Sequence, residues 1–161
     1  MEVGQLLLKE WERESPFTKK MLESVPSDKF EWKPHEKSRA LGPLALHVAA
    51  VPGRWIRILD TDVFDPTIIK QPVLEDKAAI IKLFEDNNTI LTDRLKNTPE
   101  EEYDKQFTFS PGGKPIFTTS KAMGLSTFML GHAIHHRAQL SVYLRLLNVP
   151  VPGMYGASAD E

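Results

Sequence analysis

The sequence predicts an all-α protein, an antiparallel bundle of four helices, and three observations carry that prediction. Four segments of roughly 20 residues repeat their apolar side chains with the helical period of about 3.6 residues. Prolines, glycines or a loss of that period separate these segments. The chain of 161 residues is long enough to bury a core without disulfides, so we expect one domain that spans residues 1–161.

The first two helices are separated by a polar connection. The first is expected over Glu2–Ser24, with a kink at Pro16. A segment rich in proline and charge follows over Val25–Arg39. The second helix is expected over Leu41–Asp60, where Pro52 should bend the middle.

The second half of the chain also contains two predicted helices with a connection between them. The third helix is expected over Glu75–Asn97 and is stopped by the proline that follows. From Glu100 to Thr119 the helical period is lost, and a loop or short hairpin around Gly112-Gly113 is expected. The fourth helix is expected over Ser120–Asn148. The long connection between the third and fourth helices leaves room for a non-sequential helix order.

Composition excludes several classes of protein. The chain has a net charge of −2 and no cluster of lysine or arginine, so no nucleic-acid partner is expected. No secretory segment and no apolar run long enough for a bilayer is recognisable, so we expect no membrane partner. The absence of cysteine rules out disulfides and cysteine-ligated zinc, which fits a cytoplasmic location. Any thiol chemistry must therefore use a thiol on a substrate or cosubstrate.

Three of the five histidines lie close together in the fourth predicted helix, at His132, His135 and His136. His132 and His136 are four residues apart, so both imidazoles project from one face, and two such groups can bind one transition-metal ion. Both lie on the apolar stripe of the helix, where unsatisfied imidazole nitrogens are unfavourable. The opposite face carries four polar side chains: Arg137, Ser141, Arg145 and Asn148. A pairing of His132 with His135 is a weaker alternative.

A metal ion held by this pair needs a further ligand from elsewhere in the chain. His47 lies on the apolar stripe of the second predicted helix and is the natural candidate, although such a histidine is often an ordinary core residue. His35 lies in a polar loop and is interpreted as solvated. Three neutral imidazoles suit Zn²⁺ or Ni²⁺ and leave a position open, as in catalytic sites.

Four motifs follow one another along the chain: Trp32-x-Pro34, Leu41-Gly-x-Leu44-x-x-His47, His132-x-x-x-His136-Arg-x-Gln139-x-x-x-Tyr-Leu-Arg145 and the closing segment Val149–Glu161. In order and spacing they resemble the DinB-like superfamily of metal-binding helical proteins. One departure is Arg39-Ala40, which stands where members often have serine or threonine before the second helix. The resemblance covers nearly the whole chain.

This resemblance implies a four-helix bundle of the DinB/YfiT-like type, usually a homodimer, with three histidines on one divalent ion. Carried over by position, the ligands are His47, His132 and His136, whereas His135 is not a ligand. Some relatives are transferases or isomerases that use bacillithiol, mycothiol or glutathione, while many others have no established reaction.

Two functional hypotheses follow. The first is a metal-dependent enzyme that acts on a small molecule, either a thiol-dependent S-transferase with a low-molecular-weight thiol cosubstrate or a hydrolase that uses metal-activated water. Gln139 and Tyr143 could then support the ligands or contact substrate, although a core role is favoured slightly for Tyr143. The alternative is a non-catalytic metal-binding or stress-response bundle whose ion links the second and fourth helices.

Two further expectations concern the surface and the C-terminal tail. The chain has more large aromatic side chains than one thin bundle obviously buries, namely Trp11, Trp55 and Phe64. A homodimer that covers this apolar surface is therefore expected. In the tail, Tyr155 is expected to pack back onto the bundle, over the metal pocket or the dimer interface. The acids Asp160-Glu161 are then expected to be solvated or paired with a surface cation.

Overall fold

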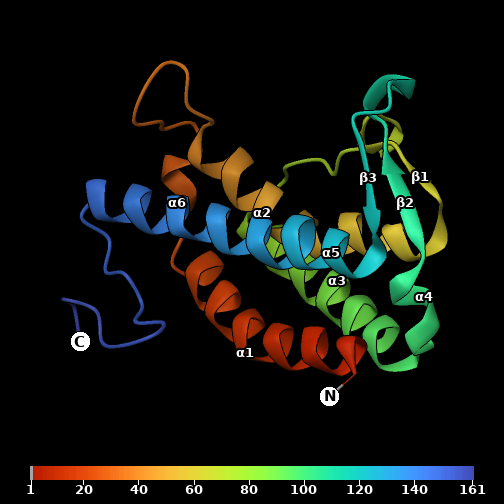
Figure 1. Ribbon diagram of the computed structural model, residues 1–161. Helices are drawn as coiled ribbons and strands as arrows, with labels where there is room; N and C mark the ends of the chain where they lie inside the picture. Colours follow the sequence, from red (N-terminus) through yellow and green to blue (C-terminus); the bar gives the residue numbers. More distant parts are fainter. Residues whose placement is uncertain (1) are drawn as a thin grey trace.

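The computed structural model describes residues 2–161 and shows a mostly helical protein with a small three-stranded sheet. The long helices are α1 (Val3–Glu23), α2 (Leu41–Trp55), α3 (Lys77–Asn97) and a composite last helix made of α5 (Lys121–Gly124), η5 (Leu125–Gly131) and α6 (His132–Leu146). All four predicted helices are present, and their ends lie within a few residues of the expected ones except at α2, which continues only as a 3₁₀ turn, η2 (Ile56–Asp60). Figure 1 shows the order of these elements.

The smaller elements connect and cap the long helices. They are the 3₁₀ turns η1 (Ser27–Lys29), η3 (Pro66–Ile68) and η4 (Pro111–Gly113), the short helix α4 (Glu100–Asp104), and the strands β1 (Val63–Phe64), β2 (Gln106–Phe109) and β3 (Phe117–Ser120). None of the helices over residues 2–161 combines the length and the apolar character needed to cross a membrane.

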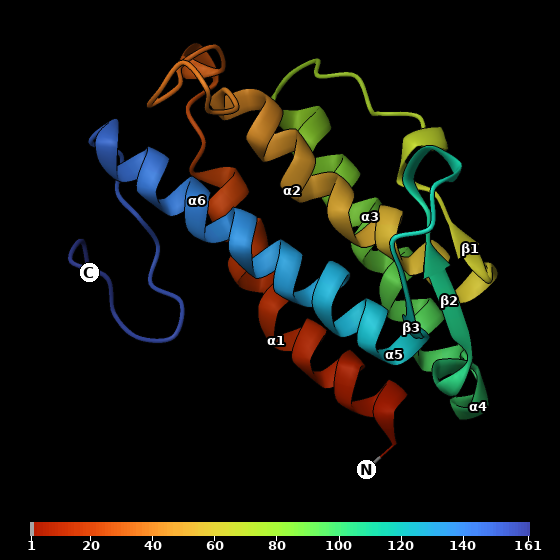
Figure 2. The ribbon, with the colours of Figure 1, turned by 45° about the horizontal axis from the view of Figure 1, so that its top comes forward.

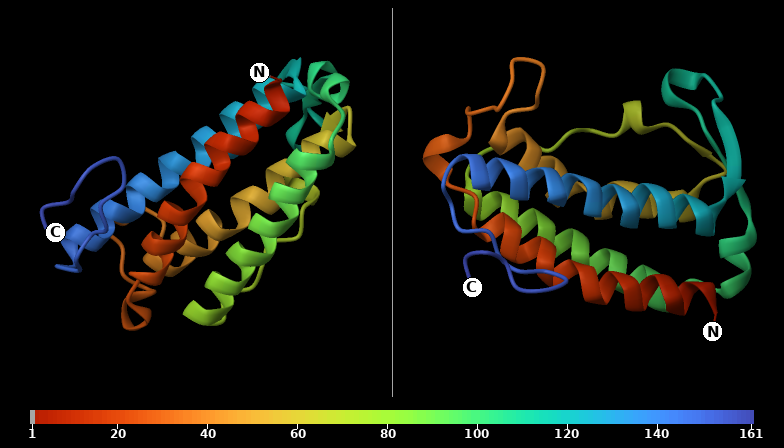
Figure 3. Two further views of the ribbon diagram at one scale, coloured as in Figure 1. Left: turned by 90° about the horizontal axis from the view of Figure 1, so that it is seen from below. Right: turned by 60° about the vertical axis from the view of Figure 1, so that its left-hand side comes forward.

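The long helices are not all antiparallel to their neighbours. α1 packs against α3 and α6, and α2 packs against the same two helices. In Figures 2 and 3, α1 and α6 run in one direction and α2 and α3 in the other, so two pairs of neighbours are parallel. The ion pair Arg94–Asp60, with 2.6 Å between Nη2 and Oδ1, links the C-terminal ends of α2 and α3. The expectation of an antiparallel arrangement throughout is therefore corrected.

The reason is a second long connection. Residues 61–76 leave the end of α2, pass through β1 and η3, and return to the end of the molecule where α2 began (Figure 2). A connection of this length can span a whole helix, which a short turn cannot do. The sequence pattern predicts such a long connection only between the third and fourth helices.

The sheet confirms one expectation and corrects another. β2 and β3 form an antiparallel hairpin with Gln106 opposite Ser120, and Gly112 and Gly113 at its tip have φ values of 62° and 74°. The sequence predicts a loop or a short hairpin here, and the structure has the hairpin. The positive φ explains the glycines. β1 pairs in parallel with β2 and was not anticipated, because two residues are too few to show an alternating pattern. The all-α class is thus corrected to mostly helical with a small sheet.

An aromatic cluster joins this sheet to the helices. Trp55 lies 4.9 Å from both Phe64 and Phe128, measured between ring centroids, and Phe109 of β2 stacks on Phe128 at 5.7 Å. Trp11, Trp55 and Phe64 are only 0%, 5% and 3% exposed. These three side chains therefore provide no apolar dimer surface, contrary to the expectation, because the sheet and the helix packing bury them within one chain.

The polar face of α6 is also partly buried, contrary to expectation. Arg137 is 1% exposed because α1 covers this side of α6. Its guanidinium forms an ion pair with Glu14, which is also 1% exposed, at 2.5 Å between Nη2 and Oε2. Arg137 additionally donates to the Glu14 carbonyl oxygen at 3.0 Å and to the Thr18 hydroxyl at 3.2 Å. A buried charge is tolerated there because it is paired and hydrogen-bonded.

The C-terminal tail packs back on the protein, as expected, but at a different place. The Tyr155 hydroxyl donates to Glu14 Oε2 at 2.7 Å and accepts from Arg137 Nη2 at 2.7 Å, while its ring meets Phe17 edge to face. Tyr155 thus caps the buried ion pair between α1 and α6. Asp160 pairs with Arg145, at 2.8 Å between Oδ2 and Nη2, as one of the expected alternatives stated.

Removing the Tyr155 hydroxyl should destabilise the protein without affecting metal binding. Tyr155→Phe deletes two hydrogen bonds to charged groups but keeps the ring, and water can replace part of them because Tyr155 is 67% exposed. We therefore expect a loss of about 1 kcal/mol, with the melting temperature lower by about 2–4 °C. The measurements are thermal unfolding and zinc affinity. An unchanged melting temperature would show that these two hydrogen bonds contribute nothing to stability.

Candidate metal centre

Two neighbouring helices, α2 and α6, bring three histidines together. His47 lies in the middle of α2, His132 is the first residue of α6, and His136 follows one turn later. The Nε2 atoms of His47 and His132 are 2.9 Å apart, and one ring nitrogen from each of the three residues lies within 4.8 Å of the others. This group could hold a metal ion. The structure therefore brings together all three histidines that the sequence singled out.

Local features of the sequence explain this placement. His132 and His136 are one turn apart and project from one face of α6. Just before them the helix widens to a π-helix over η5, a local form that is frequent at functional sites. Gly124, the last residue of α5, directly precedes this segment, and a Cβ atom there would lie 2.3 Å from a ring carbon of Phe107. Glycine therefore lets the start of the last helix lie directly against β2.

The surroundings keep the three imidazoles neutral. Burial lowers the pKa of His47 to about 3, with a further contribution from the positive charge of Arg39. Burial also lowers the pKa of His132 to about 4, with a contribution from His136, and it lowers the pKa of His136. At neutral pH the rings thus have lone pairs available, which is the form that binds transition metals.

His136 has its orientation fixed by a neighbour on the same helix. Its Nδ1 lies 2.6 Å from Gln139 Oε1. Because an amide oxygen only accepts, Nδ1 carries the proton and Nε2 keeps its lone pair. Gln139 therefore selects the ring form that a metal needs, which is the supporting role expected of a residue beside a ligand.

The other candidate residues lie outside the group of three. His135 is exposed on α6, and His35 is exposed in the loop before α2, where its Nδ1 accepts from the Lys37 amide at 3.1 Å. Tyr143 is 9% exposed, donates to the Arg39 carbonyl oxygen at 3.1 Å and packs edge to face on Trp32. These contacts favour the structural interpretation of Tyr143, because they hold the loop before α2 against α6.

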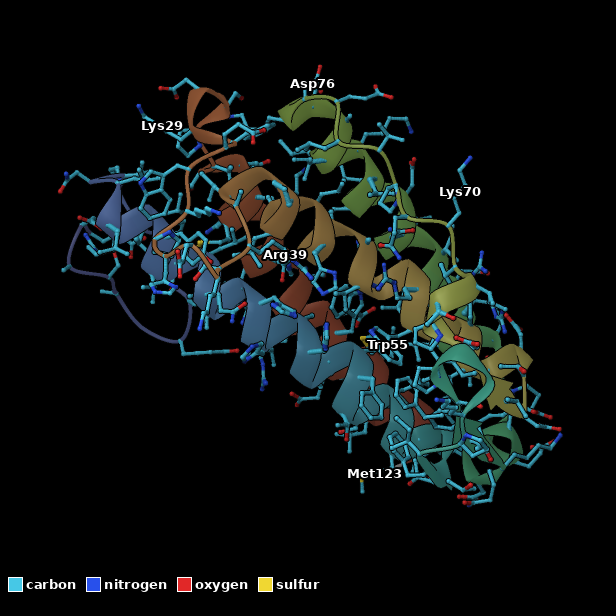
Figure 4. All side chains as sticks on the ribbon, turned by 90° about the horizontal axis from the view of Figure 1, so that it is seen from above. Lys29, Arg39, Trp55, Lys70, Asp76 and Met123 are labelled. Carbon is cyan, nitrogen blue, oxygen red and sulfur yellow. The ribbon has the colours of Figure 1, made fainter. Side chains whose placement is uncertain are left out.

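Sequence reasoning did not single out the residues that surround the histidines. The Trp55 ring lies 5.9 Å from the His132 ring, between centroids, and its buried Nε1 has no hydrogen-bond partner within residues 2–161. Figure 4 shows Arg39 and Trp55 on the face where α2 and α6 lie side by side. A cavity of about 440 Å³ adjoins this face, with His47 in its wall. The spacing of eight residues from His47 to Trp55, about two helical turns, is a signal that could have identified the tryptophan.

The metal-free protein should lose stability as the pH falls from about 7 to about 4. In an unfolded chain a histidine has a pKa near 6.5, whereas the folded protein lowers the pKa of His47 to about 3. Between these values the unfolded state binds more protons, so the free energy of unfolding decreases as the pH falls. Thermal unfolding of metal-free protein across this range checks the prediction, with His47→Gln expected to show a shallower decrease. An equally steep decrease in His47→Gln would contradict the assigned role of His47.

Comparisons with known proteins agree with the fold. A family model described as the DinB family matches residues 1–161. The chain is 28% identical over 155 residues to the protein YrdA of Bacillus subtilis strain 168, which covers 96% of this chain and 89% of YrdA. A DinB-like protein of Bacillus subtilis, YjoA, has a similar structure, with a TM-score of 0.72, 20% identity and coverage of 92% of this chain and 97% of YjoA. A DinB-like protein of Bacillus cereus ATCC 10987 also matches, with a TM-score of 0.72, 20% identity and coverage of 92% and 95%. At 20% identity, the similarity to these two structures shows the fold alone.

Proposed function

The chain belongs to the DinB family, and from this premise we propose that it is a metal-dependent enzyme whose ion is bound by His47, His132 and His136. The four long helices, taken as a bundle of the DinB type, provide the rigid frame that sets the distances between these histidines. Zinc or nickel is the ion that three neutral imidazoles favour.

The observation that carries the proposal is a set of three ligands beside a cavity. Over residues 2–161 the group that could hold an ion contains three histidines and no carboxylate. Gln139 is already bonded to His136, and the cavity of about 440 Å³ reaches His47. Three protein ligands with space beside them are the arrangement of catalytic sites, whereas structural zinc sites are closed by a fourth protein ligand.

The reaction we favour is transfer to or from a thiol, with hydrolysis as the other outcome. When bound, a divalent ion would lower the pKa of a thiol or a water molecule so that it is deprotonated near neutral pH. The chain has no cysteine, so a thiol must arrive on a low-molecular-weight cosubstrate. The aromatic cluster around Trp55 packs against the ring of His132 and shields that side of the site from water.

A non-catalytic role is the second candidate. The contact of 2.9 Å between His47 and His132 joins α2 to α6, so an ion at this place would also stabilise the packing of these helices. In this case a metal would raise the melting temperature but no substrate would turn over. The two candidates therefore predict different results in one experiment.

The experiment is an activity screen on protein loaded with zinc or nickel. Bacillithiol, mycothiol and glutathione are each offered with an electrophilic acceptor, and simple esters and amides are offered without a thiol. Turnover that is lost in His47→Ala and kept in His135→Ala supports the enzyme. No turnover, together with a higher melting temperature on metal addition, supports the non-catalytic protein.

We also propose a homodimer, with an interface formed by residues other than Trp11, Trp55 and Phe64. Val142 and Leu146 are both 57% exposed and lie one turn apart on α6. An exposed apolar pair on a helix is a surface that a second copy could cover. Sedimentation at micromolar concentration should give about twice the monomer mass of 18.2 kDa, and Leu146→Glu should shift it to the monomer. A single species at the monomer mass for the wild-type protein would contradict the dimer.

A further inference from the structure

The cavity beside the histidines carries positive charge that no acidic group balances. Arg39, in the loop before α2, and Arg54, in the last turn of α2, both line it, together with Gln71 from the connection after α2. No acidic side chain lines this cavity. Within residues 2–161 neither arginine forms an ion pair, although the protein as a whole has a net charge of −2. The cavity wall therefore carries two positive charges without a neighbouring negative charge in the described residues.

The guanidinium of Arg54 has a buried donor that forms no hydrogen bond within residues 2–161. Its Nη2 donates to Gln71 Oε1, but its Nε is buried and has no hydrogen-bond partner in the part of the chain described. Burial and the nearby charge of Arg39 both lower the pKa of Arg54. A buried donor without an acceptor is unfavourable, and so is a partly buried charge without a counter-charge. An anion that accepts a hydrogen bond from Arg54 would satisfy the donor and balance the charge.

The arginines and the candidate ligand share one surface. His47, Ala50 and Arg54 follow one another at intervals of three and four residues, so they lie along one face of α2. Arg39 and His47 line the same cavity. A molecule in this cavity can therefore contact both arginines and His47.

From these observations we propose that Arg39 and Arg54 form a binding subsite for an anionic group, a carboxylate or a phosphate, of the molecule that reacts at the three-histidine site. This inference rests on the proposed function and adds the class of substrate to it. A guanidinium presents parallel N–H donors that match both carboxylate and phosphate oxygens, which explains two arginines at this place better than two lysines. Gln71 orients Arg54 by accepting from its Nη2. The bound anionic group would fix the orientation of the substrate in the cavity beside His47.

The test is a titration with succinate and, separately, with inorganic phosphate, followed by NMR chemical shifts on both metal-free and zinc-loaded protein. We expect Arg39→Gln and Arg54→Gln each to weaken binding by at least about tenfold in both forms, since a hydrogen bond to a charged group contributes about 1.5–3 kcal/mol. Arg57→Gln is the matched control, because Arg57 is exposed just after α2 and does not line this cavity. It removes the same charge and should change the affinity less than twofold.

The outcomes separate this inference from the proposed function. If wild-type protein binds neither anion at millimolar concentration, or if all three variants behave alike, the subsite is refuted. If the anions bind through Arg39 and Arg54 but the protein takes up no metal, the proposed enzyme fails while the anion subsite stands. Tighter binding of succinate than of phosphate would assign the subsite to carboxylates, and the reverse to phosphates.

Discussion

Replacing His47 by alanine should weaken the binding of zinc or nickel by about 100-fold or more. Loss of a residue that merely supports a ligand already costs about 10–100-fold in metal affinity, so loss of a ligand should cost at least as much. His132→Ala and His136→Ala should give effects of the same size, because each contributes one nitrogen to the same group of three. Affinity is measured by competition with a chromophoric chelator at a fixed pH.

The matched control is His135→Ala. His135 is next to His136 in sequence, yet it is exposed and outside the group that could hold an ion. Its removal should change metal affinity less than about twofold, while Gln139→Leu, which frees the ring of His136, should reach about tenfold. Equal losses in the His135 and His136 variants would show that the ion is bound on the surface of α6.

The largest effect on stability is expected at the buried ion pair between α1 and α6. Arg137→Met leaves Glu14 in the interior without its main partner, and such a change costs about 3–5 kcal/mol in other proteins. We expect about 3 kcal/mol, the lower end, because Arg13 and Tyr155 still contact the Glu14 carboxylate. Urea unfolding gives the free energy.

A double variant separates the pair from the packing around it. Glu14→Gln combined with Arg137→Met removes both charges, so it should be more stable than Arg137→Met alone.

The pKa of Glu14 is lowered overall: burial raises it, but the hydrogen bonds from Tyr155 and Arg137 outweigh that effect. Because the folded pKa is depressed, this contribution is present at neutral pH and decreases as the pH falls towards the pKa of Glu14. A loss below 1 kcal/mol in Arg137→Met would contradict the role of the pair.

The sequence predicted those parts of the fold that local patterns determine. The four long helices follow from apolar residues at helical spacing, and the hairpin follows from Gly112 and Gly113, whose backbone has positive φ. The three histidines could be identified from the sequence because their spacing and their positions on apolar helix faces follow from the order of residues alone. Their actual proximity, 2.9 Å between His47 and His132, depends on the packing of α2 on α6.

Features that depend on contacts distant in sequence were not predictable in this way. Arg137 and Glu14 are 123 residues apart, and each alone has the pattern of a solvated charge on a helix. β1 has only two residues and is defined by its partner β2. The parallel run of α2 and α3 follows from the path of residues 61–76, for which the sequence offers no periodicity. The cavity that Arg39 and Arg54 share is of the same kind, because it forms where the loop that carries Arg39 folds against α2.

The central claim is that His47, His132 and His136 bind one divalent ion and leave one position open. The most direct measurement is anomalous diffraction from crystals of the zinc-loaded protein, which locates the ion and its ligands without reference to activity. The account predicts one ion bonded to three imidazole nitrogens at about 2.0–2.1 Å, with a solvent molecule at a further position on the side of the cavity. An ion bound elsewhere, or one closed by a fourth protein ligand, would contradict it.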